Sequence, residues 1–156
     1  MFYNCSSLIS LDLGNLTDCI DGFHQTNTRI GTYGTFENCT SLNFVDLHSL
    51  SSTLKANYFM NTFKECINFK SLSLDSVTDI EAGLSANQAV FYGNNYLEEI
   101  YLPSLSSVTN DYMFDLETNL KLTTLHLGKQ NENLLTACSG YSTKWGLSSL
   151  EIKFDL

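Results

Sequence analysis

The chain has 156 residues, of which 43% are hydrophobic and only 16% charged, and its formal net charge is −9. This length and apolar content predict one domain with a continuous core. Because the chain has one arginine, Arg29, and no run of basic residues, we expect no binding to nucleic acid or to an anionic membrane surface. No apolar stretch approaches the roughly 20 residues that a membrane-spanning helix needs, so no membrane insertion is expected within this segment.

A phrase of one aromatic and three aliphatic residues, with a cysteine in the first three copies, recurs six times. In the first copy, Phe2 is followed by Cys5, Leu8, Leu11 and Leu13. The last aliphatic residues of the six copies lie at steps of 34, 27, 28, 25 and 25 residues: Leu13, Leu47, Leu74, Leu102, Leu127 and Ile152. Most of these steps fall within the roughly 20–29 residues of leucine-rich repeats.

Each copy ends in two aliphatic residues spaced two apart, which predicts a short strand with both side chains on one face. In chain order, the expected strands lie near residues 10–14, 44–48, 71–75, 99–103, 124–128 and 149–153. One unit cannot bury its apolar face alone, so the units must stack. We therefore predict an α/β-type repeat solenoid: a right-handed leucine-rich-repeat coil with a short parallel sheet on its concave side and little helix.

Between each strand and the next aromatic residue, further aliphatic residues follow at three-residue steps. The strand that ends at Leu102 is followed by Leu105 and Val108. Ala89-Val90-Phe91 and Met113-Phe114 then supply a small or apolar residue before phenylalanine. This pattern resembles the BspA-like leucine-rich repeats of bacterial surface proteins, whose phrase runs approximately L-x-x-I-x-L-P-x-x-L-x-x-I-x-x-x-A-F-x-x-C.

The resemblance covers nearly the whole chain, with three departures, one of which is two extra residues between Phe114 and Leu122. The proline after the strand survives only as Pro103, and the cysteine position is lost after Cys66. The resemblance implies a non-enzymatic binding or adhesion module of an extracellular or cell-surface bacterial protein, whose partner is a protein or glycan on a host or neighbouring cell. The alternative is a structural spacer within a longer repeat array, with no ligand of its own.

We interpret residues 1–156 as a single domain of about five to six units. Neither end shows the polar capping unit that solenoids normally need. The chain is therefore expected to be a fragment of a longer array, and end-to-end association through uncapped repeats is possible.

The outward-facing strand positions are expected to form columns across the concave face. The central column is predicted to contain Asp12, Asp46, Ser73, Tyr101, His126 and Glu151. The candidate ligand-binding residues on this face are Asp12, Phe44, Asp46, His48, Ser73, Asp75, Glu99, Tyr101 and His126. Phe44 and Tyr101 are the expected contact anchors, because exposed aromatic residues are enriched at binding hot spots. The phenylalanines of the phrase are instead expected in the core, in one register: Phe2, Phe36, Phe63, Phe91 and Phe114.

Catalysis and metal binding have little support. His48 and His126 are expected to be exposed and three rungs apart, roughly 15 Å, which is too far to share a metal or a proton. Asp12 and Asp46 could bring two carboxylates together for hydrolysis or calcium binding, but two solvated acids are the simpler interpretation. No Cys-x-x-Cys occurs, so we expect no zinc site and no cofactor.

Cys5, Cys39 and Cys66 are expected to form a column, either as buried thiols or as a disulfide between stacked neighbours. Cys19 and Cys138 lie off this column and cannot be paired from the sequence. The largest insertion falls within Asp18–Thr35, as a binding loop or as a solvated bulge. Three Asn-x-Ser/Thr sequences, at Asn4, Asn15 and Asn38, are attributed to chance.

Overall fold

The computed structural model describes residues 2–18, 23–27, 31–50, 53–81, 83–84, 86–109, 112–114, 118–128 and 150–155. Its elements are β1 (Ser10–Asp12), β2 (His24–Asn27), β3 (Gly31–Gly34), β4 (Phe44–Asp46), β5 (Thr53–Lys55), β6 (Ser71–Ser73), β7 (Asp79–Glu81), the 3-10 helix η1 (Ala86–Gln88), β8 (Glu99–Leu102), β9 (Ser107–Thr109), β10 (Thr124–Leu127) and β11 (Glu151–Phe154). Within these residues, no helix has both the length and the apolar character needed to cross a bilayer.

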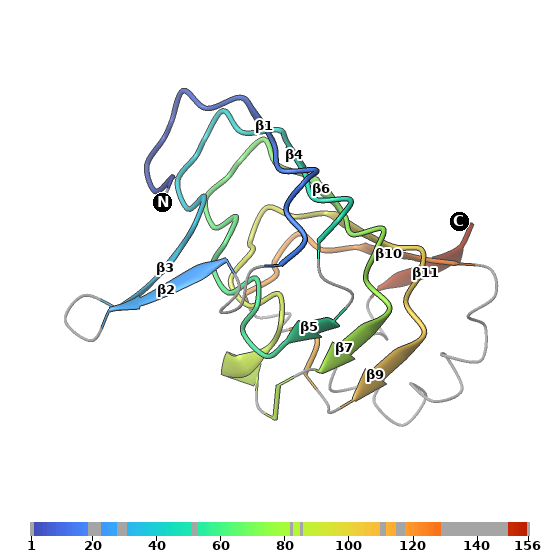
Figure 1. The fold of residues 1–156 in the computed structure, drawn as a ribbon. Helices are drawn as coiled ribbons and strands as arrows, with labels where there is room; N and C mark the ends of the chain where they lie inside the picture. Colours follow the sequence, from blue (N-terminus) through green and yellow to red (C-terminus); the bar gives the residue numbers. More distant parts are fainter. Residues whose placement is uncertain are drawn as a thin grey trace.

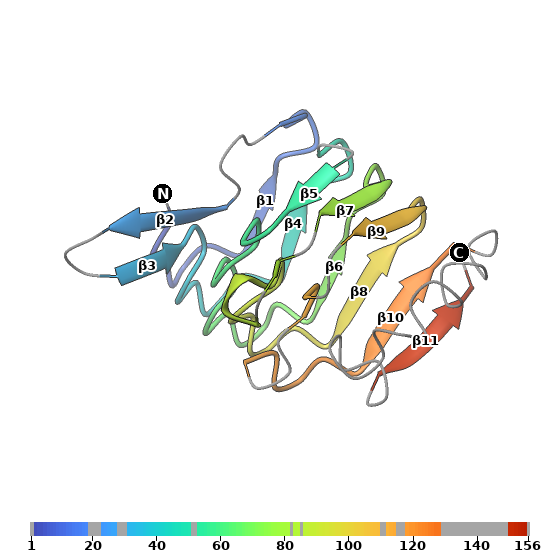
Figure 2. The same cartoon turned by 90° about the horizontal axis from the view of Figure 1, so that it is seen from below.

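One strand from each unit contributes to a row that runs along the molecule. The strands lie side by side in the order β1, β4, β6, β8, β10, β11 (Figure 2), and their ladders are parallel. The apolar residue of each strand points inward, as in the exposed–buried–exposed pattern of β6, while its neighbours face outward. This row, which we call the strand face, confirms the predicted repeat solenoid.

A second parallel sheet, β5-β7-β9, lies on another side of the coil (Figures 1 and 2). The sequence did not predict it. It is built from aliphatic residues that follow the first strand of each unit, because Leu54, Ile80 and Val108 pair in register. Ile80 and Val108 lie at the three-residue steps, whereas Leu54 lies four residues after Leu50. The units therefore carry a second short strand, and the coil has hydrogen-bonded ladders on two sides.

The last aliphatic residue of each repeat lies in the core as predicted, except in the last unit. Leu47, Leu74, Leu102 and Leu127 are buried, and Leu13 packs half-buried at the N-terminal end. Leu127, however, pairs with Phe154, whereas Ile152 pairs with Leu125. The predicted place of Ile152 beside Leu127 is therefore wrong by two residues. The central column accordingly ends at Lys153 rather than at Glu151, since Lys153 pairs with His126.

The phenylalanine rings form two columns rather than the single predicted one. In the first, Phe36 stacks between Phe2 and Phe63, with ring centroids 5.3 and 5.5 Å apart. The second contains Phe23, Phe59, Phe91 and Phe114. Phe91 and Phe114 are in the core as predicted, but they continue the second column, because Phe91 stacks on Phe59 at 5.6 Å.

The cysteines of the column are free thiols. Cys39 and Cys66 are buried, and the Sγ of each donates a hydrogen bond of 2.9 Å to the phenylalanine carbonyl of the preceding unit, Phe2 and Phe36 respectively. In the next unit Asn94 follows Phe91 at the same spacing, and its Nδ2 donates to the carbonyl oxygen of Phe59 in the preceding unit at 2.9 Å, as well as to that of Phe91 in its own unit at 2.7 Å. An amide therefore makes the contact between units that the thiols make in the earlier units. Cys19 and Cys138 lie outside the described residues.

The residue that directly precedes Cys5, Cys39, Cys66 or Asn94 adopts a left-handed backbone conformation. It is Asn4 with φ 60°, Asn38 with φ 63°, Glu65 with φ 58° and Gly93 with φ 79°. Asparagine and glycine tolerate this region better than other residues. This turn gives a structural reason for two of the Asn-x-Ser/Thr sequences, those at Asn4 and Asn38, which the sequence analysis attributed to chance.

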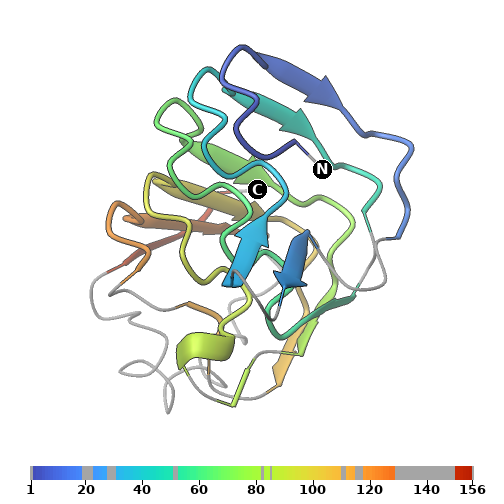
Figure 3. The same cartoon turned by 90° about the vertical axis from the view of Figure 1, so that its left-hand side faces the viewer.

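The described part of the predicted insertion is an antiparallel hairpin, β2–β3, that projects from the body of the coil (Figures 1 and 3). Phe23 anchors its base, because its ring stacks on Phe59 at 5.3 Å and its N–H donates to the carbonyl oxygen of Tyr58. Thirteen positions separate Phe23 from Phe36, against four between Phe59 and Phe63 in the next unit. The hairpin is therefore inserted between the two aromatic columns.

Candidate functional site: the hollow between β4 and β6

The strand face is interrupted between β4 and β6. These neighbouring strands belong to separate sheets and share no ladder. Side chains bridge the gap at both ends: the Nδ2 of Asn68 donates to the carbonyl oxygen of Thr40 at 2.8 Å, and the Oγ of Ser76 donates to that of His48 at 2.6 Å. Between these bridges lies an open hollow of about 380 Å³.

The hollow brings together six of the nine predicted ligand-binding residues. Its lining consists of Phe44, Val45, Asp46, Leu47, His48, Ser71, Ser73, Asp75 and Tyr101. Phe44 has 57% of its surface exposed, as expected of a contact anchor. The sequence analysis did not select Ser71, Val45 and Leu47, which reach the hollow because the ladder is interrupted. No sequence signal marks that interruption.

Asp46 and His48 form a close pair at the rim of the hollow. The Nδ1 of His48 lies 2.7 Å from the Oδ1 of Asp46, which also accepts the backbone N–H of His48 at 3.1 Å. The hydrogen bond to Asp46 raises the pKa of His48 above its ordinary value, with smaller contributions from the charges of Asp75 and Asp12. The same hydrogen bond lowers the pKa of Asp46. Most of the His48 side chain remains exposed, so a ligand can reach it.

Tyr101 is held in place on the other side of the hollow. Its hydroxyl donates to the Oε2 of Glu99 at 2.7 Å, and this hydrogen bond raises the pKa of Tyr101 to about 12. Its ring stacks on that of His126, with centroids 4.1 Å apart and planes 8° from parallel. Tyr101 therefore lines the hollow while contacts with Glu99 and His126 fix its position.

His126 is not the exposed residue that the sequence predicted. It is 5% exposed, because Tyr101 covers its ring and Asp155 covers its Nδ1 at 3.0 Å. The hydrogen bond with His126 lowers the pKa of Asp155. His126 and Glu99 thus support Tyr101 from behind and do not line the hollow.

Asp12 lies one strand away from the hollow. It pairs in register with Asp46, as predicted, and its Oδ1 accepts the backbone N–H of Gly14 at 2.9 Å. Asp46 is thus engaged with His48, whereas Asp12 bonds with the backbone of its own turn. Among the described residues, no group of three or more histidine, cysteine, aspartate or glutamate side chains is arranged to hold a metal ion.

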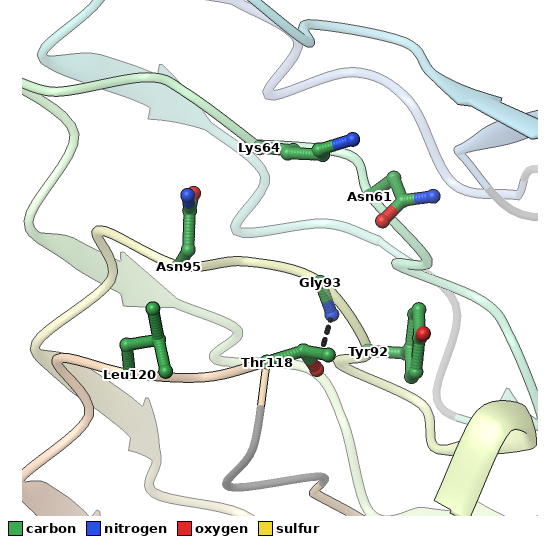
Figure 4. Close-up of a pocket in the computed structure, with 7 residues that line it drawn as sticks. All are labelled: Asn61, Lys64, Tyr92, Gly93, Asn95, Thr118 and Leu120. Carbon is green, nitrogen blue, oxygen red and sulfur yellow. Dashed lines mark hydrogen bonds between the residues drawn. The ribbon is translucent and has the colours of Figure 1, made fainter.

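A second hollow, of about 370 Å³, lies where the turns stack (Figure 4). It is lined by Asn61, Lys64, Tyr92, Gly93, Asn95, Thr118 and Leu120. Several of its polar groups already have structural partners. The amide of Asn95 bonds with Glu65, Lys64 pairs with Glu37, and Thr118 accepts the N–H of Gly93. The second hollow also has an exposed apolar residue, Leu120, but the hollow on the strand face is the better candidate because its exposed residue, Phe44, is aromatic and leucine is under-represented at binding hot spots.

Comparison with known proteins agrees with this architecture. No curated protein and no solved structure matches the chain significantly. A family model, described as the BspA-type leucine-rich repeat region, matches residues 1–144 in six copies. Leucine-rich repeats of this kind are typically non-enzymatic interaction modules, and the BspA type is generally associated with the cell surface. Because the match covers most of the chain, the protein belongs to the BspA-type leucine-rich repeat family.

Proposed function

We propose that the chain is a non-enzymatic binding or adhesion module of a bacterial cell-surface or secreted protein. It recognises a protein or glycan on a host or neighbouring cell through the hollow between β4 and β6. The observation that carries this proposal is an exposed phenylalanine, Phe44, beside a group of polar side chains in an open hollow on the strand face.

The lining has the mixed chemistry of a recognition site. Phe44 and Tyr101 offer aromatic surface, and aromatic residues dominate the energetics of many interfaces. Asp46, Ser73 and Asp75 offer oxygen atoms that can accept hydrogen bonds from hydroxyl or amine groups. With two carboxylates in the hollow and a net charge of −9, the partner is neutral or basic at the point of contact.

The test is binding of the purified chain to a glycan array and to surface proteins from candidate host cells, followed by affinity measurements on variants. Phe44→Ala removes the anchor, and Tyr101→Phe removes the hydroxyl that bonds with Glu99 while keeping the ring. Leu84→Ala is the matched control, because Leu84 is also strongly exposed but lies outside the hollow.

We expect Phe44→Ala to weaken binding by about 2 kcal/mol, roughly 30-fold, with no change in the far-UV circular dichroism spectrum. Leu84→Ala should bind like the parent chain. A partner that binds Phe44→Ala as tightly as the parent chain would show that the hollow is not the recognition site.

A further inference from the structure

The gap between β4 and β6 leaves a backbone acceptor without its strand partner. One strand further along, the N–H of Leu74 donates to the carbonyl oxygen of Tyr101 at 3.0 Å. The corresponding bond from the N–H of Leu47 to the carbonyl oxygen of Ser73 is not formed, and no other described residue donates to that oxygen. The missing bond would have crossed the gap, and both residues line the hollow. The carbonyl oxygen of Ser73 is therefore available to a ligand that donates hydrogen bonds.

The hollow is also negatively charged. Its lining contains the carboxylates of Asp46 and Asp75, no lysine or arginine, and His48 as its single basic residue. Asp46 is engaged with His48, whereas Asp75 forms no ion pair with any described residue and accepts the hydroxyl of Ser73 at 2.6 Å. The pKa of His48 reflects this field: the hydrogen bond with Asp46 raises it, and the charges of Asp46, Asp75 and Asp12 raise it further. Asp75 thus supplies a negative charge that no described residue compensates.

Aromatic surface lies beside this charge. Phe44 is largely exposed, and Tyr101 is fixed by Glu99 and His126. A planar guanidinium group can stack on an aromatic face while its N–H groups donate to carboxylate and carbonyl oxygens. An ammonium group has three donors and no plane to stack, and the hydroxyl groups of a neutral sugar would leave the charge of Asp75 uncompensated. The lining therefore fits a guanidinium group better than either alternative.

We propose that the hollow between β4 and β6 takes the arginine side chain of a protein partner. The guanidinium group lies against the ring of Phe44 and donates hydrogen bonds to the carboxylate of Asp75 and to the carbonyl oxygen of Ser73. This inference rests on the proposed function, and it narrows the partner from a protein or glycan to a protein that presents an exposed arginine.

The test uses N-acetyl-arginine amide as the probe and N-acetyl-citrulline amide as its uncharged isostere. Each is titrated into the isotopically labelled chain, and the amide signals of Val45, Ser71 and Ser73 are followed by two-dimensional NMR. We expect the arginine derivative to shift these signals with a Kd of about 1–10 mM, and the citrulline derivative to bind at least about tenfold more weakly.

Two variants separate the local charge from the overall charge. Asp75→Asn should weaken binding of the arginine derivative about tenfold, because it removes the uncompensated carboxylate while keeping an oxygen that can accept the Ser73 hydroxyl. Glu81→Gln is the matched control: it removes the same charge from an exposed position on β7, outside the hollow, and should leave binding unchanged.

Equal binding of the two derivatives, no shift with either, or an Asp75→Asn variant that binds like the parent chain would overturn the arginine inference. Methyl glucoside is titrated in parallel. If it shifts the same amide signals and the arginine derivative does not, the inference is overturned while the hollow remains a recognition site. By contrast, a surface partner that binds Phe44→Ala like the parent chain contradicts the proposed function itself.

Discussion

The thiol of Cys66 donates to the backbone carbonyl oxygen of Phe36, one unit earlier, at 2.9 Å. Cys39 makes the equivalent contact with Phe2, so the cysteine column links successive units of the coil. The buried thiol therefore has a polar partner as well as apolar neighbours. A sulfhydryl that is both buried and hydrogen-bonded in this way should be chemically inert.

Burial raises the pKa of Cys66 to about 12, and it also raises the pKa of Cys39. Alkylating reagents attack the thiolate, so both residues should react at least about 100-fold more slowly than the exposed Cys5 in the native chain at pH 8. Timed iodoacetamide labelling with peptide mass spectrometry measures the three rates. Equal labelling of Cys5 and Cys66 in the native state would contradict the buried column.

Phe23 and Phe44 allow the same substitution at a buried and an exposed site. Phe23 stacks on Phe59 at the base of the hairpin, so Phe23→Ala should lower the free energy of unfolding by about 3–5 kcal/mol. Phe44→Ala removes an exposed ring and should change it by no more than about 0.5 kcal/mol. Urea unfolding followed by circular dichroism gives both values. Similar losses for the two variants would show that Phe23 does not anchor the hairpin.

The left-handed backbone conformation of the residues that precede Cys39 and Cys66 predicts opposite changes in stability for substitutions at these two sites. Asn38→Ala should destabilise the chain by about 1 kcal/mol, because alanine tolerates positive φ poorly. Glu65→Asn should stabilise it by about 0.5 kcal/mol, since asparagine suits φ 58° better, although the hydrogen bond between Asn95 and the Glu65 carboxylate is lost.

Thermal unfolding of these two variants measures the effect, with Asn43→Ala as the control, because Asn43 is exposed and is not among the described residues with positive φ. A Glu65→Asn variant that is clearly less stable than the parent would mean that the lost contact with Asn95 outweighs the backbone strain.

The pair of Asp46 and His48 predicts a pH dependence. The raised pKa of His48 makes its contribution to stability fully present below the ordinary value of 6.5, and this contribution is lost as pH rises through the folded-state pKa. The lowered pKa of Asp46 makes its contribution present above 3.8 and lost as pH falls through the folded-state pKa. The pair therefore stabilises the fold most between these two values.

Asp46→Asn should lower the pKa of His48, because it removes the charged acceptor. A proton NMR titration of the His48 ring measures this change. The loss of stability caused by Asp46→Asn should also be larger near pH 5 than near pH 9. An unchanged His48 titration would show that the pair does not persist in solution.

The register of the last unit shows how far a repeat phrase can be followed in sequence. Leu150-x-Ile152 fits the alternation of a strand with one apolar face, and so does Ile152-x-Phe154, because alternate residues of a strand face the same side. A shift of two residues keeps every apolar side chain inside, so the pattern cannot choose between them. Pairing with β10 decides in favour of Phe154 beside Leu127.

His126 illustrates a second limit. Its position on an outward-facing column predicted exposure, but Asp155 and Tyr101 cover it. Asp155 lies in the next unit, 29 residues later, and no local pattern reports that contact. Burial of an outward-facing residue depends on what its neighbours across the strands place over it.

The sequence by itself determined that this chain is a stack of leucine-rich units with one parallel strand per unit along one face. It could do so because a period near 25 residues and the alternation within each strand are local properties that every unit repeats. Only the tertiary structure decided the second sheet, the two phenylalanine columns and the interruption between β4 and β6. These features depend on how each unit aligns with the next, and insertions of a few residues change that alignment while leaving the apolar pattern intact.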